Sequence, residues 1–389
     1  MSDIHVCICG GGRIGHLSAV LFKGSGARVT VLTSDVVGMT NRMPCAGICA
    51  AFSDGTQMFQ RPDTITSEAR QGVLGANIIA LTVPAHVRPS VLRAIAPYLH
   101  GRRRLYVGSI PGNGGFDWMA RRLLPDNCII FGLRDTPNNA YNLRRGVRVD
   151  VGIGSETIEV AYADGTPTTE QDIGDHLLSV LFARPIVRLE SFLEVTLSLG
   201  NPILHVPALY SLIGPAGPFK TSAFPKRLHW WHDLSIAGAR YIEQCVAEQL
   251  LLVDAYRSRT GARLRSVKDI TVSMRERYGG QIGDSSTLYS MLRTNKALKG
   301  MVPLKREGSH LLLDQTNRIF TEDTQFGIRI LRELADRAGI TVALIEEIDD
   351  WSRELADPTF GSAVDYLEPP GTFAGATDPS QGGVSSSVV

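Results

Sequence analysis

Short, unbroken runs of hydrophobic residues dominate the first half of the chain and predict buried strands. These runs are IHVCIC (4–9), RVTVL (28–32), ANIIALTVP (76–84), RRLYVGSI (103–110) and CIIFG (128–132). Apolar runs of this kind are typical of parallel strands that are covered on both faces. Between the first two runs, LSAVLFKGSG (17–26) has its apolar residues at helical spacing. The pattern predicts an α/β domain with a doubly wound sheet of the Rossmann type.

Two further segments, VRVDVGIG (147–154) and TIEVAYA (157–163), alternate more strongly between apolar and polar residues. We interpret them as edge strands that close the first domain near residue 185. The first domain is therefore predicted to span residues 1–185.

Further along the chain the hydrophobic pattern changes to helical spacing. The segment LSIAGARYIEQCVAEQLLLVDAYRSRTG (234–261) has a broad apolar face and ends in two arginines and a glycine, as helices often do. The segments 324–340 and 342–355 have the same periodicity. We predict an all-α second domain over residues 186–367, followed by a disordered Gly/Ser/Pro-rich tail over residues 368–389.

The composition is that of a soluble globular protein. The chain has 389 residues, of which 43% are hydrophobic and 20% charged, and its formal net charge is +1. The length favours two domains, and the balanced charge argues against a nucleic-acid or membrane surface. The sequence shows no signal peptide and no apolar run of about 18 residues, so we expect a cytoplasmic protein.

Neither the six cysteines nor the HWWH stretch predicts a metal site. The cysteines form no CxxC pair and no zinc spacing, which is typical of reduced thiols in a cytosolic protein. His229 and His232 have no third ligand close in sequence, so aromatic packing is favoured over metal binding. Trp230 or Trp231, from the same stretch, is a candidate for the wall of a substrate pocket.

A glycine loop follows the first predicted strand and precedes the first predicted helix. Gly10, Gly12 and Gly15 form G-x-G-x-x-G, with Arg13 and Ile14 inside the motif. Strand, glycine loop and helix in this order predict a dinucleotide-binding domain. The glycines allow a tight turn, and the helix N-terminus offers unpaired N–H groups to a pyrophosphate.

The second predicted strand ends in Thr33, Ser34 and Asp35, the region that distinguishes NAD from NADP. Thr33 stands where NAD-selective folds often carry an acid, and Ser34 where NADP-selective folds often carry arginine. Asp35 would repel a 2′-phosphate if it turned inward, so the cofactor is predicted to be NAD(P)H with NAD favoured. Because ligands of such sheets bind at the carboxyl ends of the strands, Pro84 and the loop 110–115 are expected to border the cofactor.

His205 stands in an almost entirely apolar stretch, SLGNPILHVPALY (198–210). By itself, a histidine in such a run is usually a core residue whose ring nitrogens are satisfied locally. The residues around it therefore do not assign it a function.

The order of these motifs resembles that of the octopine/nopaline (opine) dehydrogenase family. The resemblance is carried by GGGRIGH, ALTVPAHVRPSVLRAIAPYL, NPILH, YGGQIGDSSTLYSMLRTNKALKG and NRIFTEDTQFGI, which span residues 10 to about 340. The last two stretches are more specific than the glycine motif, which many dehydrogenases share. The resemblance implies an NAD(P)H-dependent oxidoreductase acting on CH–NH donors. Such an enzyme reductively couples an amino acid to a 2-oxo acid, such as pyruvate, and catalyses the reverse oxidation.

The resemblance also implies roles for three residues of the second domain. His205 would be the catalytic acid/base, Asp323 its carboxylate partner, and Arg318 the residue that holds a substrate carboxylate. These side chains suit the chemistry, since imidazole exchanges protons near neutral pH and a guanidinium fork grips a carboxylate at two points. Asn201, four residues before His205, could orient substrate or nicotinamide if the segment is helical. Asp323 is also expected to cap a helix that starts at residue 324.

The sequence departs from the family pattern in one stretch and leaves other functions open. Family members carry an arginine in an ACR-like stretch, where this chain has Tyr141 or Asn142, with Arg144 and Arg145 just beyond. This difference leaves the carboxylate-binding arrangement open, and with it the substrates. The extra segments of relatives that build metal-scavenging opines are missing, which argues against a metallophore role.

Two alternatives remain: a 2-oxo or 3-hydroxy acid reductase without an amine substrate, and a non-catalytic NAD(P)-binding sensor. Amine-dependent oxidation of NAD(P)H would separate the first alternative from an opine dehydrogenase. The sequence identifies neither the amino acid nor the oxo acid, and it leaves product stereochemistry undetermined. The sequence does not determine the oligomeric state, so the question of a homodimer is left open.

Overall fold

The computed structural model describes residues 4–101, 104–219 and 223–367. The chain divides into two compact units, Met1–Thr196 and Leu197–Val389. The predicted boundary at residue 185 lies before this division, because the strand Ile186–Arg188 pairs in parallel with Ile158–Tyr162 of the first unit. The predicted disordered tail lies outside the described residues.

The first unit is built on an eight-stranded sheet in the order β12-β11-β8-β7-β6-β1-β2-β5. Neighbouring strands run parallel except β8 and β11, which pair antiparallel. The strands are β1 (His5–Cys9), β2 (Arg28–Leu32), β5 (Thr64–Thr66), β6 (Ile78–Leu81), β7 (Leu105–Ser109), β8 (Cys128–Leu133), β11 (Ile158–Tyr162) and β12 (Ile186–Arg188). From β1 the chain winds first to β2 and later, on the other side, to β6. This reversal confirms the predicted doubly wound sheet.

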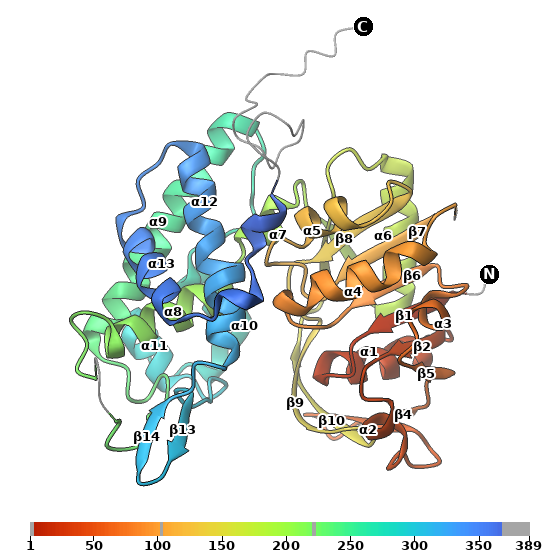
Figure 1. Cartoon of the computed structure of the whole chain (residues 1–389), viewed down its shortest axis with the longest axis horizontal. Coiled ribbons are helices and arrows are strands. Elements are labelled where there is room, and N and C mark those ends of the chain that lie inside the picture. The colour runs from red at the N-terminus through yellow and green to blue at the C-terminus, as the bar shows by residue number, and fades with distance from the viewer. Residues whose placement is uncertain (1–3, 102–103, 220–222, 368–389) are drawn as a thin grey trace, which may run out of the picture. The chain divides into compact units, whose positions relative to one another are not determined.

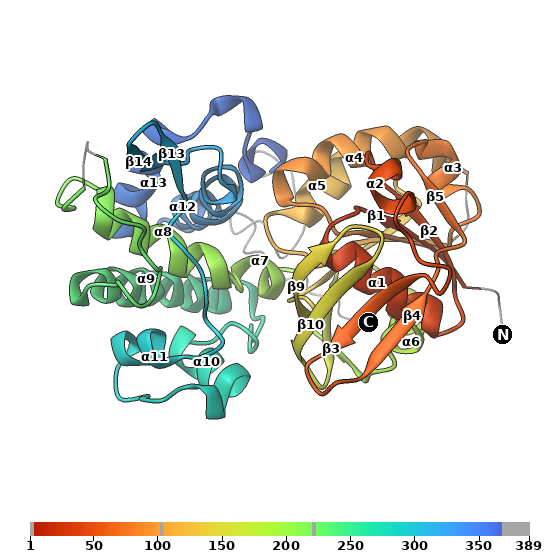
Figure 2. The same cartoon turned by 90° about the horizontal axis from the view of Figure 1, so that it is seen from below.

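Helices cover both faces of this sheet, as its continuous apolar strands require. One face is covered by α3 (Ala69–Val73), α4 (Arg88–Ile95) and α5 (Phe116–Leu123), and the other by α1 (Arg13–Gly24) and α6 (Thr168–Phe182), as Figure 2 shows. The strands β1 and β6 are buried at every position. The short helices α2 (Val36–Thr40) and α7 (Leu193–Leu197) follow β2 and β12 in the chain.

A second, four-stranded sheet packs against α1 in the order β4-β3-β10-β9, as Figure 2 shows. Figure 1 gives the whole chain from a second side. Its strands are β3 (Ile48–Phe52), β4 (Gln57–Gln60), β9 (Asn138–Arg144) and β10 (Arg148–Gly154). The prediction of two edge strands is wrong, because β10 lies between β3 and β9 while β11 lies between β8 and β12. In β10 the alternation instead reflects a sheet with one covered face, since Val149 and Val151 are buried and Arg148 and Asp150 are partly exposed.

The second unit is helical, as predicted, with one small addition. Its helices are α8 (Gly200–Ile213), α9 (Ile236–Thr260), α10 (Ile270–Tyr278), α11 (Leu288–Thr294), a π-helical segment (Ile319–Ile328), α12 (Arg329–Ala338) and α13 (Ala343–Leu355). The predicted glycine cap of α9 is present, with Gly261 at φ 71°. The addition is a hairpin of β13 (Leu304–Glu307) and β14 (His310–Leu313). Within the described ranges, no helix is both long and apolar enough to cross a membrane.

Candidate functional site

The glycine loop lies where three strands of the large sheet end together. The last residue of β1, Cys9, is in register with Leu32 of β2 and Leu81 of β6. The segments that follow these strands therefore meet at one edge. Gly10 donates its backbone N–H to the carbonyl of Leu32 at 2.9 Å, and Thr82 donates to the carbonyl of Cys9 at 2.9 Å. This is the edge at which a doubly wound sheet binds its ligand.

Two glycines of the motif are required by close contacts, and the third leaves space. At Gly10, whose φ is +133°, a Cβ would lie 2.6 Å from the Thr82 Oγ1 atom, and at Gly15 it would lie 1.9 Å from the carbonyl oxygen of Gly10. At Gly12 a Cβ would meet nothing within 4 Å. Gly12 is also the N-cap of α1 and provides no capping side chain. The open space in front of a helix N-terminus fits a dinucleotide pyrophosphate.

The other residues predicted to bind the cofactor lie on the first turn of α1 or just after β2 and β6. Arg13 is exposed and Ile14 partly buried on the first turn of α1. Thr33 is buried, and its Oγ1 atom lies 2.7 Å from the position of a Cβ on Gly11. Ser34 is exposed directly after it, and Pro84 is exposed at the start of the turn that follows β6.

The loop after β7 is held by a buried arginine that sequence reasoning missed. Arg88, on α4, is 1% exposed, and its guanidinium donates hydrogen bonds to the carbonyls of Asn113 and, at 3.1 Å, Pro111. It also lies 6.0 Å from the ring centre of Phe116, at the start of α5. The loop predicted to border the cofactor is thus pinned at two carbonyls. No signal in the sequence distinguishes Arg88 from the other arginines of the chain.

In the second unit, His205 and Asp323 form a hydrogen-bonded pair. The Nδ1 atom of His205, on α8, lies 2.9 Å from the Oδ2 atom of Asp323, on the π-helical segment. The carboxylate side chain is 1% exposed and the imidazole 22% exposed. The two segments approach closely because position 327 is glycine, where a Cβ would lie 2.5 Å from the Pro202 side chain. A half-open imidazole held by a buried carboxylate is suited to proton transfer.

Two tryptophans lie against the imidazole. The ring centres of Trp230 and Trp231 lie 5.4 and 5.8 Å from that of His205, at interplanar angles of 20° and 23°. Both tryptophans are buried, so they shield the histidine rather than expose aromatic surface. Neither His229 nor His232 lies in a helix: His229 forms an isolated β-bridge with Met301, His232 lies in the turn that follows, and their ring centres are 6.3 Å apart. Among the described residues, no group of three or more His, Cys, Asp or Glu side chains is placed to hold a metal ion.

Arg318 reaches the same carboxylate from the solvent side. Its Nη2 atom lies 3.8 Å from the Oδ1 atom of Asp323 and 3.3 Å from the Oε2 atom of Glu322, and its side chain is 50% exposed. Asn201 is exposed on α8, one helical turn before His205. The structure thus brings His205, Asp323, Arg318 and Trp230 together, with Asn201 one turn away.

The prediction that Asp323 caps a helix is wrong. The helical segment already begins at Ile319, so Asp323 lies inside it and not at its start. Its carboxylate is therefore directed to His205 and Arg318.

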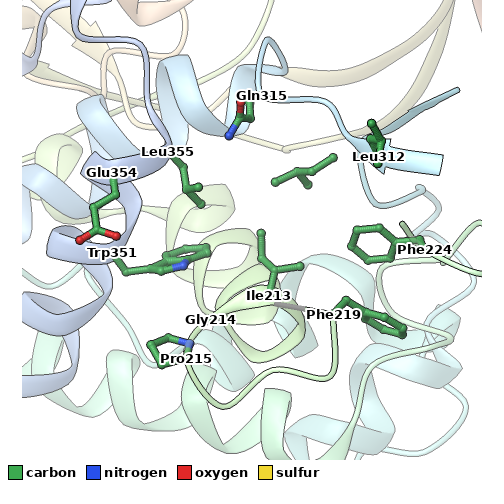
Figure 3. A pocket seen from close by; sticks show the side chains of 11 residues that line it. Ile213, Gly214, Pro215, Phe219, Phe224, Leu312, Gln315, Trp351, Glu354 and Leu355 are labelled. Atoms are coloured by element: carbon green, nitrogen blue, oxygen red, sulfur yellow. The ribbon is translucent and has the colours of Figure 1, made fainter. Parts of the chain in front are cut away.

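A separate cavity of about 420 Å³ lies at the other end of α8 (Figure 3). It is lined mainly by apolar side chains of the segments around α8, the hairpin and α13, among them Ile213, Phe219, Phe224, Leu312, Trp351 and Leu355. Its lining includes none of His205, Asp323 and Arg318. The cavity is therefore separate from the His205–Asp323 pair.

Comparison with known proteins identifies the family. Residues 188–356 match the α-helical domain of NAD/NADP octopine/nopaline dehydrogenases. The uncharacterized protein y4xO of Sinorhizobium fredii is 37% identical over 369 residues, which cover 93% of this chain and 97% of that protein. The octopine dehydrogenase of Pecten maximus is 28% identical over 365 residues, covering 90% of each chain.

A solved structure of octopine dehydrogenase with NADH and L-arginine has the same fold. It superposes with a TM-score of 0.77 at 24% identity, covering 90% of this chain and 89% of that chain. Sequence and fold therefore agree over both units. The chain belongs to the octopine/nopaline dehydrogenase family and is an NAD(P)-dependent dehydrogenase that acts on CH–NH donors.

Proposed function

We propose that this enzyme condenses the amine of an amino acid with a 2-oxo acid, such as pyruvate, and reduces the product to an N-(carboxyalkyl)amino acid. The reverse reaction oxidises that product. The observation that carries the proposal is the His205–Asp323 pair at 2.9 Å, with Arg318 beside its carboxylate. The family and the octopine dehydrogenase structure that holds L-arginine support this substrate class.

The cofactor is NAD(P)H. The residues proposed to bind it are Gly10, Gly12, Gly15 and Thr33. When bound, it supplies the two electrons and the hydrogen that convert the carbon–nitrogen double bond to a single bond. The pyrophosphate is assigned to the open space at Gly12, in front of α1. The pinned carbonyls of Pro111 and Asn113 keep the neighbouring loop in one conformation.

His205 exchanges the protons of the reaction. Its Nδ1 atom is engaged by Asp323, so Nε2 is the atom that faces the reactants. Condensation of amine and oxo acid first gives a carbinolamine, and the protonated imidazole donates a proton as the hydroxyl leaves as water. The nitrogen keeps its own hydrogen, so the product of this step is an iminium ion, and its reduction to a secondary amine requires no further proton. Asp323 stabilises the imidazolium and fixes the ring orientation throughout.

Arg318 binds the carboxylate of the 2-oxo acid. A guanidinium presents two parallel N–H donors to a planar carboxylate and keeps its charge at all relevant pH values. With 50% of its side chain exposed, Arg318 is accessible to a substrate from solvent. Trp230 forms an apolar wall beside the imidazole, and Asn201 is placed to donate a hydrogen bond to the amino acid or to the nicotinamide amide.

An initial-rate screen tests this proposal. Oxidation of NADH and NADPH is followed over a grid of amino acids and 2-oxo acids, with each component omitted in turn. We expect oxidation to require both an amine and an oxo acid. Equal rates with the oxo acid alone would make the enzyme an oxo-acid reductase. Tight cofactor binding without turnover across the grid would make it a sensor.

A further inference from the structure

The tip of the β9–β10 hairpin lies against the glycine loop, although the two are far apart in sequence. The backbone N–H of Gly146, at this tip, donates to the Nε2 atom of His16 at 2.8 Å. The Nδ1 atom of His16 must then carry the proton, and it donates to the carbonyl of Gly12 at 2.8 Å. Burial lowers the pKa of His16, which favours this neutral form. A neutral histidine thus connects the hairpin to the cofactor loop.

The hairpin tip is also fixed against α2. Gly146 has a φ of 68°, and a Cβ at this position would lie 2.3 Å from the carbonyl oxygen of Met39. Met39 in turn lies close to Gly11, since a Cβ on Gly11 would be 3.6 Å from its sulfur atom. This packing holds Arg145, the residue before Gly146, beside the end of β2.

Arg145 is paired with the acid that the sequence suggested as a barrier to NADP. Its Nη1 atom lies 3.1 Å from the Oδ2 atom of Asp35. The other carboxylate oxygen of Asp35 accepts a hydrogen bond from the backbone N–H of Gly38 at 2.9 Å, capping α2. Both oxygens of Asp35 are thus engaged. The side chains of Arg145 and Asp35 are 53% and 42% exposed, so the ion pair is accessible from solvent.

We propose that Arg145 determines cofactor specificity by making the site accept the 2′-phosphate of NADPH. The inference rests on the proposed cofactor role of the glycine loop. In doubly wound dinucleotide sites an acid at the end of the second strand selects the ribose 2′-hydroxyl of NAD, whereas an arginine accommodates the 2′-phosphate of NADP. Here the arginine comes from a different sheet, compensates the charge of Asp35 and presents a guanidinium fork to a phosphate. NADPH is therefore bound alongside NADH rather than excluded.

Equilibrium binding of NADH and NADPH to the full chain tests the inference without any substrate. The dissociation constants are measured by cofactor fluorescence for the parent, Arg145→Gln, Arg145→Lys and Asp35→Asn. We expect Arg145→Gln to weaken NADPH binding about tenfold or more, because a charge-assisted contact to phosphate is lost, and to change NADH binding less than about threefold. Arg145→Lys should keep part of the NADPH affinity, and Asp35→Asn should strengthen it.

Arg148→Gln is the matched control. Arg148 lies on the same hairpin and pairs with Asp150 at 2.7 Å, with side chains 38% and 33% exposed. Its loss should leave the ratio of the two dissociation constants unchanged. Thermal unfolding of all variants checks that each is folded.

Three results would overturn the inference. The first is an equal loss of affinity for both cofactors in Arg145→Gln, which would make the ion pair structural. The second is parent protein that binds NADH but not NADPH. The third is an Arg148→Gln variant with the same selective loss. In each of these three cases the parent protein still binds NADH, so the proposed reaction stands. A parent protein that binds neither NADH nor NADPH would refute the proposed function itself.

Discussion

His205 and Asp323 differ in their exposure to solvent, and this difference suits them to proton transfer. The carboxylate is 1% exposed, and a buried charge of this kind is costly unless it is paired. Its partners are the Nδ1 atom of His205 at 2.9 Å and the guanidinium of Arg318 at 3.8 Å. The imidazole keeps one side open to reactants. The buried carboxylate of Asp323 thus orients the imidazole of His205. It also lies next to Arg318, the residue proposed to bind the substrate carboxylate.

Replacing His205 by Gln should reduce kcat by roughly 10²- to 10⁴-fold, because the group that exchanges protons with the reactants is lost. Cofactor affinity should stay near that of the parent, since the glycine loop belongs to the other unit. Thermal unfolding and kcat per folded enzyme are measured on the same preparations. A purely structural histidine would give the opposite result, with lower stability and an unchanged kcat.

Asp323→Asn should give a smaller loss of kcat than His205→Gln, and the double variant should be little worse than His205→Gln alone. Groups that act as one unit are far from additive when they are removed together. The four enzymes are compared by kcat under identical conditions. Multiplicative losses in the double variant would show that the two residues act independently.

Arg318→Lys should raise the KM of the oxo acid and lower turnover, because lysine keeps the charge and loses the fork. The KM of the amino acid should change less. Arg306→Lys, an exposed arginine on β13, serves as the control and should leave both values unchanged. If Arg318→Lys and Arg306→Lys behave alike, Arg318 does not bind the oxo acid.

At the level of elements, the proposed catalytic pair depends on the close packing of α8 against the π-helical segment. Gly327 permits this packing, since a Cβ there would lie 2.5 Å from Pro202 on α8. Pro202 is one turn away from the histidine. A change in the spacing of these two segments therefore changes the distance between His205 and Asp323.

Gly327→Ala should destabilise the protein by about 1–3 kcal/mol, because the added methyl group overpacks the contact, and should lower kcat as well. Denaturant unfolding and steady-state kinetics are measured together. Gly280→Ala is the control, since a Cβ at Gly280 meets nothing within 4 Å. A Gly327→Ala enzyme with the stability and kcat of the parent would mean that the close approach is not needed.

The first turn of α5 carries a buried acid with an effect on stability. Asp117 is 1% exposed, and burial, together with the nearby charge of Asp164, raises its pKa to about 7. The folded state therefore binds a proton more tightly than the unfolded state, whose ordinary value is 3.8. By linkage, this group makes the free energy of unfolding decrease as the pH rises from about 4 to about 7.

Asp117→Asn should remove that part of the pH dependence. Urea unfolding is measured for the parent and the variant at pH 5 and pH 8, and the difference between the two proteins isolates the contribution of Asp117. We expect the variant to lose less stability than the parent between these pH values. Equal losses in the two proteins would show that the carboxyl group titrates in the folded state as it does in the unfolded chain.

Some elements could be predicted from the sequence because their signals are local. The strand Arg28–Leu32 and the capped helix Ile236–Thr260 follow directly from hydrophobic periodicity and end residues. The partners of a strand leave no such local signal. For this reason the sequence does not reveal that β10 pairs with β3, and its alternation predicts an edge strand where the structure has an inner one.

At the scale of the whole molecule, the residues of the proposed sites are divided between two compact units. The residues proposed to bind the cofactor, from Gly10 to Pro84, lie in Met1–Thr196, and those proposed to transfer protons lie in Leu197–Val389. The resemblance to opine dehydrogenases pointed to His205, Asp323 and Arg318. Neither periodicity nor motif could reveal contacts such as that of Arg145 with Asp35, whose partners are 110 positions apart.

Identification of the product tests the central claim most directly. The enzyme is incubated with an amino acid, pyruvate and NAD(P)H, and the product is analysed by mass spectrometry. A secondary amine is expected, with the combined mass of amino acid and pyruvate minus one water plus two hydrogens, formed once per NAD(P)H oxidised. Formation of the 2-hydroxy acid instead, with the amino acid recovered unchanged, would contradict the account.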